Sequence, residues 1–149
     1  MNGLLHNAEI DRVLTRNAGT SGGTVSSDIV DMKGFDWITW VIAFQDVLTT
    51  SVITVSMLED DDSAMGSTTE VAAADKITRT AGASDVDSKL MVYECLRPKE
   101  RYVRLTVGIA TANAPIDSIV AIKGKARTVK VTQPADVLDQ KQVATPTTS

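Results

Sequence analysis

The stretch DWITWVIAF, residues 36–44, decides the fold that this sequence predicts. Aromatic and β-branched side chains favour a pleated sheet, and they make up most of the run. Because the segment from Trp37 to Phe44 is apolar almost throughout, we expect a strand covered on both faces, as in the middle of two stacked sheets. This run is therefore the best candidate for a central strand.

Several other runs have the character of strands. The alternation in SVITVSML (residues 51–58) predicts one buried and one exposed face. We also expect strands in SSDIVDM (26–32), KLMVYECL (89–96), RYVRLTV (101–107) and DSIVAIKGKARTVKV (117–131). The last run supplies one strand or two, separated at Gly124. The intervening RPKE (97–100) predicts a tight connection that joins its two neighbours into an antiparallel hairpin. Residues 58–67 are typical of an exposed turn, whereas residues 69–80 fit either an irregular strand, which we favour, or a short helix.

Seven or eight short strands at this spacing predict an all-β fold, namely an antiparallel β-sandwich, of which the jelly roll is one arrangement. No long amphipathic helix separates the runs, which disfavours parallel βαβ architecture. Residues 1–24 contain AGTSGGT and predict a flexible N-terminal arm, and the proline- and threonine-containing residues 133–149 predict an extended C-terminal arm. The sandwich domain then covers residues 25–132.

Composition narrows the classes of function. A chain of 149 residues fits one domain with a core of its own. No apolar run approaches the roughly 20 residues that span a bilayer, and the first residues lack signal-peptide features, so we expect synthesis in the cytoplasm and no membrane partner. The net charge of −4 argues against direct binding to nucleic acid. Cys95 is the single cysteine, which excludes an internal disulfide and a thiolate metal cluster, and we expect a buried thiol without a chemical role.

Candidate catalytic and metal-binding residues are few. A triad or metal site would have to use His6, the single histidine, which lies in the predicted arm. Asp85 and Asp87 could imitate the carboxylate pair of a hydrolase, but their small neighbours favour a surface turn. The acidic run 59–62 could attract Ca²⁺, yet it lacks the alternating ligands of an EF-hand and is more typical of a solvated loop. We therefore expect no enzyme activity, no cofactor and no metal site.

Basic residues are the better candidates for a binding surface. They gather around residues 97–104 and again around residues 123–130. Few aromatic residues are interleaved with them, so a protein partner fits better than a nucleic acid. The residues that we expect to contact a partner are Arg97, Lys99, Arg101, Arg104, Lys125 and Arg127.

Three segments carry a resemblance to a known group: DMKGFDWITWVIAF (31–44), RPKERYVRLTV (97–107) and SIVAIKGKAR (118–127). The chain resembles small tailed-bacteriophage virion proteins encoded among head genes. These share a strand like KRYVRVT, followed by a final apolar strand that ends in a short basic segment. The resemblance covers about the middle two thirds of the chain and implies a capsid decoration, or cement, protein. This chain differs from the group's pattern in its longer polar tail, whose removal (residues 134–149) we expect to leave the core folded and to weaken attachment.

The resemblance also implies the partners. Such a protein would form a homodimer or homotrimer and would bind the major capsid protein on the outer surface of the virion, after synthesis in the host bacterial cytoplasm. One alternative is another β-rich virion part, such as a head-tail joining or tail-tube subunit. A less favoured alternative is a carbohydrate-binding module, for which Trp37 or Trp40 would have to be exposed.

Overall fold

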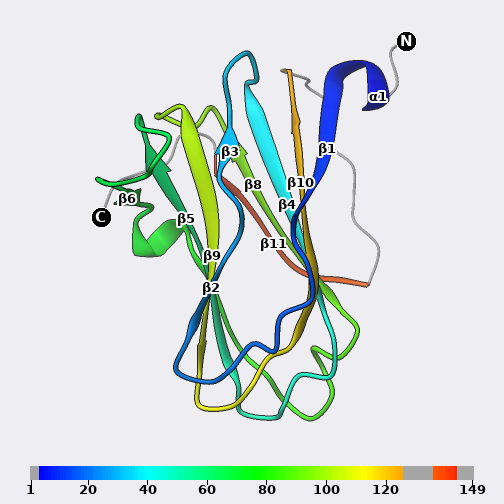
Figure 1. Ribbon diagram of the computed structural model, residues 1–149. Helices are drawn as coiled ribbons and strands as arrows, with labels where there is room; N and C mark the ends of the chain where they lie inside the picture. Colours follow the sequence, from blue (N-terminus) through cyan, green and yellow to red (C-terminus); the bar gives the residue numbers. More distant parts are fainter. Residues whose placement is uncertain (1–3, 126–135, 144–149) are drawn as a thin grey trace.

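The structure, a computed structural model, describes residues 4–125 and 136–143. Its strands form two sheets that lie face to face (Figure 1). One sheet has the order β1-β10-β4-β8-β11, with bounds β1 Ala8–Leu14, β4 Trp37–Phe44, β8 Leu90–Leu96, β10 Ile116–Gly124 and β11 Val137–Val143. The other sheet has the order β2-β9-β5-β6, and in addition β3 pairs with β9 and β7 pairs with β5. Its strands have the bounds β2 Thr24–Ser26, β3 Val30–Asp31, β5 Val52–Asp60, β6 Thr69–Glu70, β7 Ile77–Thr80 and β9 Tyr102–Ala110.

The predicted central strand is β4, which lies in the middle of the first sheet. It pairs antiparallel with β10 on one side and with β8 on the other. Ile38, Trp40 and Ile42 point into the core and are fully buried. The alternate side chains, Trp37, Thr39 and Val41 among them, are half-buried on the outer face, so the covering of this strand is complete on the core side only.

Strands β5 and β9 are the pair at the centre of the second sheet. They run antiparallel over nine residue pairs, from Val52 opposite Ala110 to Asp60 opposite Tyr102. The alternation predicted for residues 51–58 is confirmed, because Ile53, Val55 and Met57 are fully buried. Buried side chains from both sheets form one core, so the antiparallel β-sandwich is confirmed. A jelly-roll arrangement within that class stays a prediction.

The predicted hairpin between KLMVYECL and RYVRLTV is wrong. The two runs are β8 and β9, which lie in opposite sheets, and residues 97–101 cross from one sheet to the other. Both runs bury alternate side chains, as predicted, but they do so from opposite sides of the core. Alternation shows which face of a strand is buried and says nothing about which strand is its neighbour.

Both segments predicted as irregular arms contain a strand. In residues 1–24, a single helical turn, α1 Leu4–Asn7, precedes β1, which pairs antiparallel with β10. In residues 133–149, β11 pairs parallel with β8 and buries Val143. The two strands lie at opposite edges of the first sheet and mix charged or polar residues with apolar ones, because an edge strand buries few side chains. Apolar periodicity is therefore weak in both.

Residues 69–80 combine the two structures that the sequence left open. The short strands β6 and β7 both pair with β5, and a 3₁₀ turn, Ala73–Asp75, lies between them. The irregular strand that we favoured describes this segment better than a helix.

Candidate functional site

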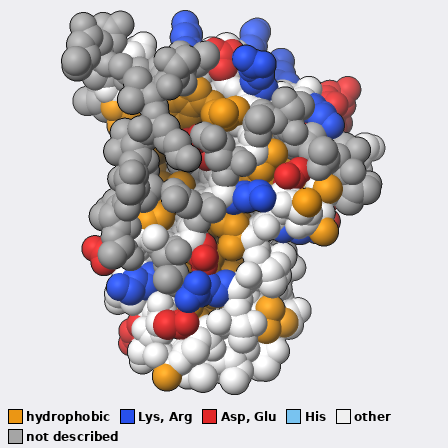
Figure 2. All heavy atoms as spheres, turned by 180° about the vertical axis from the view of Figure 1, so that it is seen from behind, with side chains coloured by type: hydrophobic (Ala, Val, Ile, Leu, Met, Phe, Trp, Pro, Cys, Tyr) orange, Lys and Arg blue, Asp and Glu red, His pale blue; other side chains and the backbone are white. Residues whose placement is uncertain are grey.

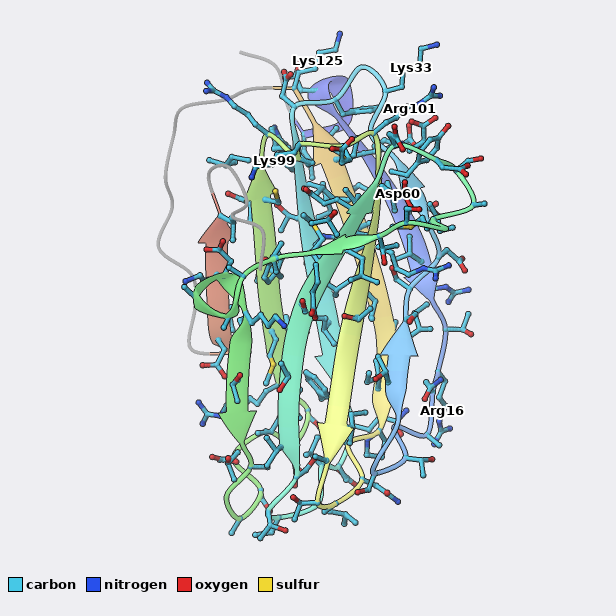
Figure 3. The ribbon with its side chains drawn as sticks, turned by 90° about the vertical axis from the view of Figure 1, so that its left-hand side faces the viewer. Arg16, Lys33, Asp60, Lys99, Arg101 and Lys125 are labelled. Carbon is cyan, nitrogen blue, oxygen red and sulfur yellow. The ribbon has the colours of Figure 1, made fainter. Side chains whose placement is uncertain are left out.

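Four of the six predicted contact residues lie at one end of the sandwich. Arg97, Lys99 and Arg101 belong to the β8–β9 connection, and Lys125 follows the end of β10. Figure 3 shows Lys99, Arg101 and Lys125 at this end together with Lys33, from the β3–β4 connection. We call these two connections, residues 32–36 and 97–101, with Lys125, the basic end.

Backbone hydrogen bonds hold the two connections of the basic end together. The Met32 N–H donates to the Arg101 carbonyl oxygen at 2.8 Å, and the Arg97 N–H donates to the Asp36 carbonyl oxygen at 2.7 Å. Asp36 in turn donates its N–H to the Gly124 carbonyl oxygen at 2.8 Å. Arg97 has a left-handed backbone conformation (φ 61°), which costs free energy for residues other than glycine. Such a conformation persists where surrounding contacts hold it. The backbone of the basic end is therefore held in a defined conformation.

An open hollow of about 330 Å³ lies between the two connections. Part of its lining is apolar and consists of Met32, Phe35 and Pro98. The rest carries four basic and two acidic side chains: Lys33, Arg97, Lys99, Arg101, Asp36 and Glu100.

One cation of the basic end has a carboxylate partner within the chain. Arg101 forms a two-pronged contact with Asp31, with Nε to Oδ1 at 2.9 Å and Nη2 to Oδ2 at 2.8 Å, and its guanidinium also lies over the Tyr102 ring. The hydrogen bonds from Arg101 hold the pKa of Asp31 well below its usual range. Arg101 is thus committed to this pair, which fixes the β3 end against the start of β9.

The other cations of the basic end have no ion-pair partner in the part of the chain that the structure describes. Among the residues that the structure describes, Lys33, Arg97, Lys99 and Lys125 have no carboxylate within ion-pair distance. The first three of these are exposed and line the hollow. Charges left unpaired in this way are available to an acidic partner.

A buried carboxyl group, Glu59, lies beneath the basic end. Because β5 alternates, Glu59 follows Met57 on the core side, and its carboxylate accepts the Lys99 N–H at 3.2 Å. Burial raises the pKa of Glu59 above its ordinary value, and the Lys99 N–H only partly offsets this. The carboxyl group therefore fixes the backbone of a residue whose charged side chain faces solvent.

The acidic run 59–62 is only in part the solvated loop that we predicted, because Asp61 and Asp62 are exposed after the end of β5 whereas Glu59 and Asp60 are not. Glu59 and Asp60 end β5 and are both buried. Asp60 accepts N–H groups from Asp62 and Ser67, and these bonds lower the pKa of its carboxyl group. Extending the alternation of residues 51–58 by one step would have placed Glu59 in the core. Within the described residues, no three His, Cys, Asp or Glu side chains gather closely enough to hold a metal ion.

Of the two remaining predicted contact residues, the structure describes Arg104, which does not join the basic end. Arg104 lies along β9, opposite Leu58 of β5, and is half-buried. Its side chain points away from the core, because Val103 and Leu105 on either side of it point inward. Arg127 lies outside the described residues.

The carboxylates of Asp85 and Asp87 both form bonds that hold the loop before β8 in place. Asp85 accepts the Gly82 N–H at 2.8 Å and pairs with Arg79 at 3.1 Å, while Asp87 accepts the Val47 N–H at 2.8 Å. The surface turn that we favoured agrees with these bonds, which engage both carboxylates.

The two tryptophans and the cysteine pack into the fold. Trp40 is fully buried, and Trp37 is half-buried, with its Nε1–H donated to the Lys125 carbonyl oxygen. The Trp40 ring is therefore closed to a sugar, and the Trp37 ring is in part covered. Cys95 is buried, as predicted, and burial raises the pKa of its thiol to about 12, which makes thiolate chemistry unfavourable. His6 belongs to α1.

The chain is similar in fold to the PBSX exported protein XepA. That crystal structure superposes with a TM-score of 0.53 over 90% of this chain, at 19% sequence identity. The chain spans 42% of the length of XepA, so the likeness is to part of that protein and concerns the fold. No family model and no curated protein sequence matches this chain.

Within the described residues, no helix has the length and apolar character of a membrane span. Figure 2, a view from behind, shows basic and acidic side chains interspersed over the described surface with small apolar patches between them.

Proposed function

We propose that this chain is a structural virion protein that decorates the head of a tailed bacteriophage. It binds the lattice of the major capsid protein on the outer surface, stabilises the head, and acts without catalysis or a cofactor. The observation that carries the proposal is the basic end, where Lys33, Arg97 and Lys99 are exposed and unpaired on connections fixed by backbone hydrogen bonds.

Three further observations support the proposal. The sandwich offers a rigid scaffold, which is what repeated docking on a lattice requires. The segments 31–44, 97–107 and 118–127 resemble phage head proteins, and two of them supply the connections of the basic end. The fold is similar to that of XepA, a protein of the phage PBSX. Weak contacts repeated over a lattice give high overall occupancy, so a small docking surface is sufficient.

We also propose that the protein assembles as a homodimer or homotrimer before it binds. Edge-to-edge strand pairing between copies is not favoured at β1, β2 or β3, because β2 and β3 are short and β1 carries charged residues. Light scattering on the purified chain gives the oligomeric state directly.

Co-sedimentation with purified heads tests the main proposal. We expect the protein to pellet with heads, and antibody labelling in negative stain to mark the whole shell. Labelling of a single vertex would refute decoration and indicate a joining protein.

A tail-tube subunit is the second candidate. It is favoured by one observation, namely that a hollow at the opposite end of the sandwich is lined by two acidic residues, Asp46 and Asp117, and one basic residue, Lys89. The hollow of the basic end has the opposite excess, with four basic and two acidic side chains. Ends of opposite charge can stack copies head to tail, a contact that grows open assemblies. Filaments in the purified protein, together with no binding to heads, would favour this role over decoration.

A further inference from the structure

The hollow of the basic end combines two kinds of surface. Phe35 and Pro98 are half-buried and give it an apolar part, while Lys33, Arg97 and Lys99 place unpaired cations around that part. An isolated inorganic anion would use only the cations. A short peptide with an apolar side chain between carboxylates would use both surfaces.

The same residues disfavour a nucleic acid. Asp36 and Glu100 lie in the lining and would repel a phosphate backbone, which carries a charge at every nucleotide. One face of the Phe35 ring is already covered by the Lys123 ammonium group, 4.5 Å from the ring centroid, so stacking of a base there is obstructed. The protein as a whole is acidic as well. A peptide with a few carboxylates, spaced to meet the cations, carries fewer charges past Asp36 and Glu100 than a phosphate backbone does and so reduces this repulsion.

The connections are already held in place before a partner binds. The hydrogen bonds from Met32 to Arg101, from Arg97 to Asp36 and from Lys99 to Glu59 fix both sides of the hollow. Ordering loops on binding costs free energy, and a preformed site reduces that cost.

We propose that the hollow between residues 32–36 and 97–101 binds an extended acidic peptide segment of a partner protein. An apolar side chain of that segment packs against Phe35 and Pro98, and its flanking carboxylates pair with Lys33, Arg97 and Lys99. The inference rests on the proposed function, in which the segment belongs to the major capsid protein.

The test uses the full chain, labelled with ¹⁵N, and a blocked peptide of Glu and Asp residues around a central Leu. The control peptide has Gln and Asn in place of the acids. Saturable amide shifts confined to residues 32–36 and 97–101 are expected with the acidic peptide, weakening as salt is added because exposed charges are screened. An absence of shifts, or equal shifts with the control peptide, would overturn the inference.

Two variants with the same net charge locate the contact. Arg97→Gln/Lys99→Gln removes two cations of the hollow, and Arg12→Gln/Arg16→Gln removes two exposed cations elsewhere; Figure 3 shows Arg16 at the opposite end. Since the first variant removes two exposed cations that each form a modest ion pair with the peptide, we expect it to lose about tenfold in peptide affinity and the second variant to lose little. Equal losses in the two variants would mean that binding follows net charge and not this site. Lys33→Gln/Lys99→Gln replaces the first variant if its left-handed Arg97 position affects folding.

Three more measurements separate the outcomes. An oligothymidylate that shifts the same amides as strongly as the peptide would overturn the choice of a peptide partner, as would inorganic phosphate alone at equal concentration. Heads that still bind Arg97→Gln/Lys99→Gln at full occupancy would overturn the inference while the proposed function stands. Peptide binding at the hollow by a protein that never binds heads would retain the inference about the peptide and reject the proposed function.

Discussion

Replacing Gly124 by alanine tests the packing that positions Lys125 and the basic end. Gly124 is the last residue of β10, buried opposite Trp37. A Cβ atom built there would overlap the Trp37 ring, with Cε2 at 2.8 Å, and would lie 2.7 Å from the Asn7 carbonyl oxygen. The ring has little freedom to move, because its Nε1–H is bonded to the Lys125 carbonyl oxygen at 2.6 Å.

The magnitude follows from two opposing effects. Overpacking a close-packed site costs about 1–3 kcal/mol. Alanine also restricts the unfolded chain, which stabilises the folded state by about 0.4–1 kcal/mol where no strain opposes it. Gly66→Ala isolates the steric part, since Gly66 is exposed and a Cβ there would have no neighbour within 4 Å.

We expect Gly124→Ala to be about 1–3 kcal/mol less stable than Gly66→Ala, which for a chain of this size is roughly 2–12 °C in Tm. Urea unfolding followed by tryptophan fluorescence measures the difference. If the two variants unfold at the same urea concentration, Trp37 does not pack on Gly124 and our account of how Lys125 is positioned is wrong.

Three further predictions concern the core and its edge. Burial raises the pKa of Glu59, so the folded state holds the proton of this carboxyl group more tightly than the unfolded state does. The free energy of unfolding therefore falls as the pH rises from the ordinary carboxyl pKa through the raised one. Glu59→Gln should have a higher Tm than the parent at about pH 8, and an advantage that is as large at about pH 4 would contradict this. From the sequence we expected deletion of residues 134–149 to leave the core folded, but the structure shows that it removes β11. The deletion should therefore lower the free energy of unfolding by at least the roughly 1.5–3 kcal/mol that a buried valine such as Val143 contributes. An unchanged unfolding midpoint would show that β11 does not stabilise the fold. The Cys95 thiol should be inert to Ellman's reagent in the native protein at about pH 8 and react fully in denaturant, whereas rapid native labelling would mean that it is accessible.

The sequence predicted the sandwich because its core strands have strong periodicity. In β5 the inward residues from Ile53 to Met57 are apolar, so alternation indicates which of its side chains are buried. In β4 nearly every residue is apolar, so the strand was predicted from that run and its inward face was not. Neighbours do not follow from alternation, which is why β8 and β9 were paired incorrectly. Edge strands bury too few side chains to produce a pattern, and β1 and β11 were accordingly missed.

The candidate site was predictable in part. Arg97, Lys99 and Arg101 are close in sequence, so their clustering needed no fold. Lys33 comes from a distant connection and joins them only because β3 and β9 pair. The pairing of Arg101 with Asp31 and the burial of Glu59 depend on that same tertiary arrangement, so a local pattern of charges does not indicate which cations are left free.

Cryo-microscopy of heads saturated with the protein tests the central claim most directly. Our account predicts density over the whole shell, with each sandwich attached by its basic end, so that residues 32–36 and 97–101 face the major capsid protein. Density at a single vertex, or attachment by the opposite end that carries Arg16, would contradict it.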